Sequence, residues 1–142
     1  GTLIANPYTE SYFKFTKYAD YEDSNLLLHE TDGHLYSIQS GLYQDAGLPI
    51  NIFTRTARLD GGNLDNKILA EVDVIGEKTV DFMMMRWSDD DCTTFSKYRR
   101  VNLNYKRPSL RRCGNFERRT IENRYIGNFP LRLSALELEI GK

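Results

Sequence analysis

The sequence has few of the residues that build metal sites and covalent crosslinks. Its 142 residues include two cysteines and two histidines. Cys92 and Cys113 form no close metal-ligand pair, and His29 and His34 lie far from them along the chain. We therefore expect no zinc site and no cofactor. Two cysteines in a chain of this size do not make a disulfide scaffold, so free, reduced thiols are the default expectation.

Long hydrophobic runs and helical periodicity are also missing. No apolar stretch approaches the roughly 20 residues that a membrane-spanning helix needs. The first residues, GTLIANPYTES, lack the basic start and the apolar stretch of a secretory signal. No window of a dozen residues repeats apolar side chains at positions i, i+3, i+4 and i+7. These absences argue against membrane insertion and against a helical fold.

Alternation of apolar and polar residues, punctuated by turns, dominates the chain instead and predicts an all-β protein. We expect an antiparallel β-sandwich or a partial propeller-like domain. Residues 1–24 are rich in tyrosine and acids and alternate little, so they are expected to be an irregular lead or linker segment. Residues 25–142 are expected to form a single all-β domain.

Turn residues and apolar positions locate several strands. The dipeptide Asp32-Gly33 supplies the positive φ angles of a tight turn, and it predicts a hairpin of residues 26–31 and 34–39. An offset of the apolar positions near Ser134 predicts a β-bulge in the last strand. The run KILAEVDVIG predicts a strand on which one face is formed by Ile68, Ala70, Val72 and Val74.

The most apolar stretch, TVDFMMMRW, leads into three consecutive aspartates. Because side chains alternate along an extended strand, Met83, Met85 and Trp87 are expected to face the core. The aspartates could form a metal site, a catalytic acid cluster or a tight turn.

The spacing of this segment resembles the Asp-box pattern S-x-D-x-G-x-T-W of β-hairpin turns. Ser88, Asp90, Thr94 and Phe95 occupy the corresponding positions, and Cys92 stands in place of the glycine. The carboxylate of Asp90 is then expected to accept hydrogen bonds from turn amides and hydroxyls, which is a structural role. A calcium loop needs converging oxygen ligands, whereas adjacent aspartates on an extended chain point to opposite sides.

A catalytic interpretation needs a second acid, a histidine or a nucleophile at a defined position, and the sequence singles out none. The structural turn is therefore the favoured interpretation, with the calcium site and the enzyme as weaker alternatives. We expect a protein without catalytic residues.

Charge is unevenly distributed although the net charge is only −1. Residues 97–124 hold ten Lys/Arg and two Glu, so this segment carries +8 and the remainder −9. Such a division is typical of a protein that binds an anionic partner or the acidic part of a neighbouring copy. The arginines expected on a turn and an outer face, as candidate contacts with another subunit or with DNA, are Arg111, Arg112, Arg118 and Arg119.

Two longer segments of the chain read MMMRWSDDDCTTFSKYRRVNL and LRRCGNFERRTIENRYIGNFPLRLSALELEI. They resemble the C-terminal region of the tail hub, or packaged-DNA stabilisation, proteins of short-tailed bacteriophages. The family pattern is L-R-W-S-D-D-G-G-x-T-W-S, followed by R-x-x-L-G-x-x-R-D-R-V-F-E-L-R. Upstream, GLYQDAGLPINIFTRTARLD is similar to the family's Y-x-D-x-G-x-P-I segment. The resemblance spans roughly residues 28–140, and Asp91 and Cys92 replace the family's paired glycines.

This resemblance implies a structural virion protein located in the tail and assembled in the host cytoplasm. It implies a homo-oligomeric ring of about six copies. The ring would join the portal-adaptor to the distal tail and help retain packaged DNA, and its partners would be other tail and portal-adaptor proteins.

Two alternatives come from other classes of protein. A carbohydrate-binding β module is suggested because Asp-boxes also occur in sialidase-like propellers and nine tyrosines could stack on sugar rings. One Asp-box is too few for a propeller, however, since each blade needs roughly 40–45 residues. A nucleic-acid-binding module is suggested by the basic segment, in which aromatic residues are interleaved.

Overall fold

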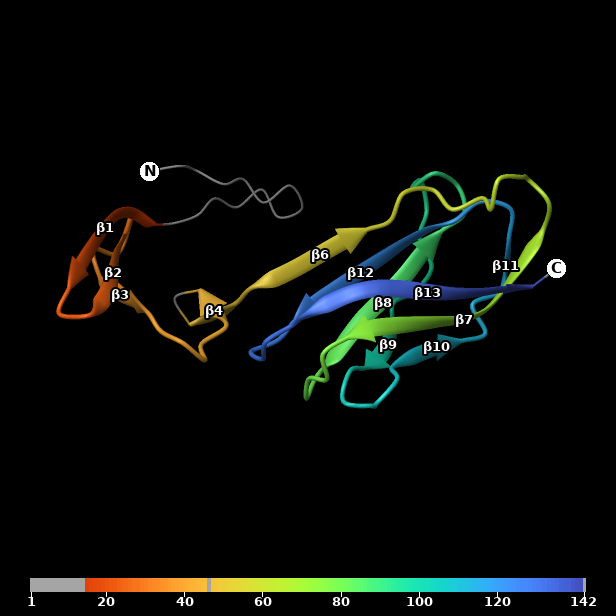
Figure 1. The fold of residues 1–142 in the computed structure, drawn as a ribbon. Coiled ribbons are helices and arrows are strands. Elements are labelled where there is room, and N and C mark those ends of the chain that lie inside the picture. The colour runs from red at the N-terminus through yellow and green to blue at the C-terminus, as the bar shows by residue number, and fades with distance from the viewer. Residues whose placement is uncertain (1–14, 46, 142) are drawn as a thin grey trace. The chain divides into compact units, whose positions relative to one another are not determined.

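The computed structural model describes residues 15–45 and 47–141. Every regular element in this part of the chain is a β-strand, and the strands of the three larger sheets pair antiparallel. The all-β prediction is confirmed. The chain divides into two compact units, Gly1–Leu48 and Pro49–Lys142 (Figure 1), which we describe separately. This division lies further along the chain than the boundary expected after residue 24.

The first unit contains a three-stranded sheet in the order β1-β2-β3. Its strands are β1 (Phe15–Tyr21), β2 (Ser24–His29) and β3 (Leu35–Ile38). The expectation of an irregular lead is wrong for β1, while residues 1–14 lie outside the described part. The strand β1 could not be predicted from the sequence, because all of its residues except Phe15 are exposed. Without a buried face, apolar and polar residues need not alternate. Two short strands, β4 (Gln44–Asp45) and β5 (Leu48–Pro49), pair with each other.

The hairpin predicted around Asp32-Gly33 is confirmed, since β2 and β3 pair on either side of this turn. Gly33 has a φ of 69°, a region that glycine enters without steric cost. The carboxylate of Asp32 accepts a hydrogen bond from the backbone amide of His34 at 2.8 Å and another from the Tyr36 hydroxyl at 2.8 Å. These hydrogen bonds, of which the one from the His34 amide has the largest effect, hold the pKa of Asp32 below its usual value.

The second unit is built from two four-stranded sheets. One, called the β12 sheet below, has the order β6-β12-β8-β9, with β6 (Asn51–Arg55), β12 (Thr120–Ile126), β8 (Phe82–Ser88) and β9 (Arg99–Asn102). The other, called the β7 sheet, has β7 (Lys67–Gly76) at its centre. On one side of it lies β13 (Leu133–Gly141), and on the other β10 (Ser109–Arg111) and β11 (Asn115–Phe116).

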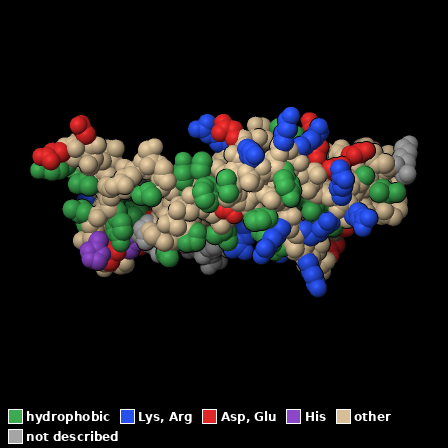
Figure 2. All heavy atoms as spheres, turned by 90° about the horizontal axis from the view of Figure 1, so that it is seen from below, with side chains coloured by type: hydrophobic (Ala, Val, Ile, Leu, Met, Phe, Trp, Pro, Cys, Tyr) green, Lys and Arg blue, Asp and Glu red, His purple; other side chains and the backbone are tan. Residues whose placement is uncertain are grey.

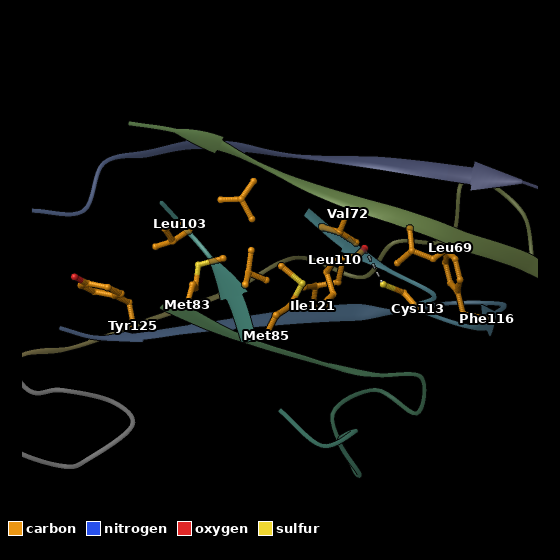
Figure 3. Packing of buried hydrophobic residues seen from close by; sticks show 12 residues of the cluster. Leu69, Val72, Met83, Met85, Leu103, Leu110, Cys113, Phe116, Ile121 and Tyr125 are labelled. Carbon is orange, nitrogen blue, oxygen red and sulfur yellow. Dashed lines mark hydrogen bonds between the residues drawn. The ribbon is translucent and has the colours of Figure 1, made fainter. Parts of the chain in front are cut away.

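The hydrophobic core lies between these two sheets, and both contribute side chains to it (Figure 3). Met83 and Met85 of β8 are fully buried, as predicted. Trp87 is only half-buried and packs against the margin of the cluster. The two methionines belong to the same cluster as buried residues of the opposite sheet, among them Leu69, Val72 and Leu110.

The predicted facing of β7 is wrong over its first half. Val72 and Val74 are buried as expected, but Ile68 and Ala70 are exposed and Leu69 is buried in their place. The cause is a register shift against β13, where Glu139 pairs with Glu71 but the next residue, Ile140, pairs with Leu69. One extra residue, Ala70, is thereby inserted into β7 and inverts the alternation on its N-terminal side.

The bulge predicted near Ser134 is confirmed. Leu133 pairs with Gly76 and Ala135 pairs with Ile75, so Ser134 is the additional residue on β13.

Candidate functional site: the aspartate turn and the arginines around it

The three aspartates lie in a turn that follows β8. Asp90 Oδ1 accepts a hydrogen bond from the Thr94 amide at 2.8 Å and another from the Ser88 hydroxyl at 2.7 Å, while the Thr94 hydroxyl donates to Oδ2. Ser88 Oγ in turn accepts from the Cys92 amide at 2.9 Å. The side chain of Asp90 therefore caps its own loop, which is the geometry expected for the central residue of an Asp-box.

These hydrogen bonds also set the acidity of the turn. The hydroxyl of Thr94, then its amide, then the hydroxyl of Ser88 lower the pKa of Asp90 to about 2, from a usual 3.8. Asp91 and Cys92 have φ angles of 55° and 68° at the positions where the resembling family has paired glycines. The turn thus keeps a left-handed backbone in two residues that have side chains, at a modest steric cost.

The other two aspartates are occupied in ion pairs. Asp89 forms two close contacts with Arg119, and Asp91 lies 3.0 Å from Arg118. The three carboxylates consequently face different partners instead of a common centre. Across the described ranges 15–45 and 47–141, no group of three or more His, Cys, Asp or Glu is arranged to hold a metal ion. The two cysteines are both free thiols.

Arg119 corrects one of the predicted surface contacts, because its side chain is only 2% exposed. Its guanidinium donates to both oxygens of Asp89, at 2.7 and 2.8 Å, and to the carbonyl oxygens of Cys113 and Asn115. The planar group also lies between two aromatic rings, 5.0 Å from the centroid of Trp87 and 4.8 Å from that of Phe116.

Arg119 therefore has a structural role, and its side chain is buried instead of lying on the outer face where it was expected. Its bidentate pair joins the aspartate turn to the start of β12, and the two rings hold the guanidinium in a fixed orientation.

The other three candidate arginines are accessible to different degrees. Arg111 is exposed and pairs with Glu71 at 3.1 Å, whereas Arg118 is part-exposed and pairs with Asp91. Arg112 is exposed, with a φ of 57°. The backbone at Arg111 and Arg112 is held by Arg99 of β9, whose guanidinium donates hydrogen bonds to their carbonyl oxygens at 2.8 and 3.0 Å.

A second ionic cluster, which the sequence did not reveal, surrounds Glu122 in the middle of β12. This carboxylate has no exposed surface. It accepts hydrogen bonds from Arg86 at 2.7 Å, from Arg55 at 2.8 Å and from the Tyr98 hydroxyl at 2.9 Å. The ring of Phe95 lies over the guanidinium of Arg86, 4.2 Å from its centroid. The terminal aromatic residue of the Asp-box thus covers this ion pair.

Opposing effects act on the pKa of Glu122. Burial raises it, while the hydrogen bonds from Arg86, Arg55 and Tyr98 lower it, and the net result is a pKa below the usual value. The same carboxylate contributes to a raised pKa for Tyr98, after the larger effect of burial. Only the register of three strands brings these residues together, since Glu122 pairs across β12 with Arg55 on one side and Arg86 on the other.

The polar residues of this region are used to stabilise one another. An ionised Glu122 with three donors and a capped Asp90 of low pKa are poorly suited to accept a proton from a substrate. The arrangement is suited to holding the aspartate turn, β8 and β12 together.

No known family matches the chain, and a comparison with curated proteins gave no match. In the part of the chain that the structure describes, no helix is long and apolar enough to cross a membrane.

Proposed function

We propose that the chain is a structural protein of a phage tail, a component of the hub or nozzle ring that joins the portal-adaptor to the distal tail and helps retain packaged DNA. The observation that carries the proposal is that the side chains on which the family resemblance depends pair with one another. Arg86 pairs with Glu122, Arg119 pairs with Asp89, and Asp90 caps its own turn. Side chains that saturate one another in this way stabilise an architecture, as a structural protein requires.

The first unit supports the proposal independently. Phe15 is the single buried residue among those described in this unit. The described residues of this three-stranded sheet enclose only a small interior, and a sheet of this size needs a further surface against which to pack. Large apolar side chains that it exposes are Tyr18, Tyr21, Leu35, Ile38, Leu42 and Leu48. This composition fits a protein that is completed by neighbours in an assembly.

A carbohydrate-binding module is less well supported. Stacking on sugars needs aromatic rings on a common face, but Tyr18 and Tyr21, each 62% exposed, lie three positions apart on β1 and therefore point to opposite sides.

Electron microscopy of the purified full chain tests the proposal. We expect closed rings with a central opening. A glycan array probed with the same preparation provides the contrast. Particles that never form rings, together with specific binding of one glycan class, would replace the structural proposal with the carbohydrate-binding one.

A further inference from the structure

The outer face of the β12 sheet carries more positive charge than the sheet itself neutralises. Arg124 of β12 pairs with Met84 of β8, and Met84 pairs with Arg100 of β9. These three residues therefore form one row across the sheet, on the face opposite the buried Met83 and Met85. On the other side of Arg124 the row continues to Phe53. We call Phe53, Arg124, Met84 and Arg100 the cation row.

The two arginines of the cation row have no carboxylate partner among the described residues. Arg124 donates to the side-chain oxygen of Asn51 at 3.1 Å, and Arg100 lies over the ring of Phe82 at 5.8 Å. The neighbouring row of the same face holds Arg55, Glu122 and Arg86, where one carboxylate serves two arginines. Among the residues that the structure describes, four arginines and one glutamate lie in these two rows and sum to a charge of +3.

The opposite side of the second unit has the complementary character. On the outer face of the β7 sheet, Glu137 lies directly across from Asp73, and Glu139 lies directly across from Glu71. Like charges placed opposite each other destabilise a strand pair unless cations lie between them. Arg107 bridges one pair, at 2.7 Å from Asp73 and 2.9 Å from Glu137.

The second pair is compensated less well. Arg111 lies 3.1 Å from Glu71, but Glu139 has no cation partner in the ranges 15–45 and 47–141. A hollow of about 230 Å³ opens here. Its lining is Glu71, Asp73, Arg107, Glu137, Leu138 and Glu139. With four carboxylates and two arginines, this acidic face has a net charge of −2 and room for incoming side chains.

The geometry points to a contact between copies in which the cation row of one copy docks on the acidic face of the next. The occupant is a second copy of this chain because the chain itself supplies both surfaces, on opposite sides of one rigid unit. Met84, which is half-buried, adds apolar area to the arginines, as interface centres require. Figure 2 shows how widely Lys and Arg side chains are spread over one face of the second unit.

A contact between two different faces is heterologous, so it repeats from copy to copy and closes into a ring when the rotation permits. This inference rests on the proposed function, for which it names the contact between subunits. It moves the contact from the four arginines first expected to Arg100 and Arg124.

Charge reversal in two complementary variants of the full chain tests the contact. In R100E/R124E the cation row becomes negative, and in E137K/E139K the acidic face becomes positive. Each variant alone then opposes like charges, and we expect self-association by sedimentation equilibrium to weaken by more than about a hundredfold. In an equimolar mixture each reversed face meets its complement, so association returns. A variant that combines all four changes also associates.

The matched control for R100E/R124E is K78E/K106E, which lowers the net charge by the same amount at exposed loop positions. We expect this control to associate as strongly as the parent. Thermal unfolding of every variant should match that of the parent, which shows that the variants fold. Association of the parent weakens with added salt, because exposed charges are screened.

Several outcomes would overturn the inference. Undiminished association of either double variant places the contact elsewhere, and rings seen by microscopy would leave the proposed function standing. A parent that stays monomeric at its highest soluble concentration shows that copies do not meet through these faces. Loss of duplex DNA binding in R100E/R124E, with no self-association in the parent, assigns the cation row to DNA instead.

Discussion

Arg119 is the residue whose removal tests the structural account most sharply. Its replacement by alanine leaves the Asp89 carboxylate and the carbonyl oxygens of Cys113 and Asn115 without their donors, and it opens a space between two aromatic rings. Asp89 is 42% exposed and can be rehydrated, so the cost comes mainly from the lost packing of the buried side chain and from the carbonyl oxygens left without a donor, and it amounts to about 2–4 kcal/mol. Since small domains are stable by only about 5–15 kcal/mol, this loss is a large fraction of the total.

The neighbouring residue provides the matched control. Arg118 is also paired with an aspartate of the turn, but its side chain is 41% exposed. Arg118→Ala should therefore change the free energy of unfolding by no more than about 1 kcal/mol. Arg119→Lys should lie between the two alanine variants, because an ammonium keeps the charge but loses the planar fork.

Urea unfolding followed by far-ultraviolet circular dichroism measures these differences. Fluorescence is less suitable here, since the only tryptophan contacts Arg119 itself. The reasoning is refuted if Arg119→Ala and Arg118→Ala destabilise equally, because burial would then have no energetic consequence.

Three further predictions concern other buried or capped groups. The pKa of Asp90, about 2 when folded against 3.8, means that its carboxylate stabilises the fold above pH 4 and loses this effect as the pH falls towards 2. The melting-temperature gap between Asp90→Asn and the parent should narrow over that interval, and a constant gap would contradict the capping role. Glu122→Leu should destabilise by about 3–5 kcal/mol and Glu122→Gln by less, in the same urea assay, because the amide oxygen of Gln still accepts hydrogen bonds from the three donors. Equal losses would contradict a contribution from those hydrogen bonds. Lys67 is 6% exposed and donates hydrogen bonds to the carbonyl oxygens of Asn63, Asp65 and Glu117. Lys67→Met should therefore lower the free energy of unfolding by about 1.5–3 kcal/mol and make the loop before β7 more sensitive to protease. An unchanged cleavage rate would argue against that anchoring.

Local features of the fold could be predicted from the sequence because neighbouring residues determine them. The Asp32-Gly33 hairpin follows from the positive φ that its turn needs, and the bulge at Ser134 follows from a visible offset of apolar positions. The bulge at Ala70 could not be predicted, because the alternation of side chains that the sequence suggests for this strand continues through Ala70 without a visible break. The same limit applies to β1, whose exposed residues carry no periodic signal.

Charge placement could be predicted less well than turn chemistry. Whether an arginine is buried depends on a partner that the fold brings close, and Asp89 lies thirty positions before Arg119. Glu122 depends on two strands that meet β12 from opposite sides, so nothing near it in sequence indicates the cluster. Arg124 and Arg100 became candidates only when the strand register placed them in one row.

The central claim, a structural role in a phage tail ring, is tested most directly by locating the chain in a particle. Cryo-electron microscopy of tails that contain the chain should show a ring of copies at the portal vertex, each containing the two four-stranded sheets. The account also predicts that the β12 sheet of one copy faces the β7 sheet of the next. Tails whose rings contain no density for this unit would contradict the claim.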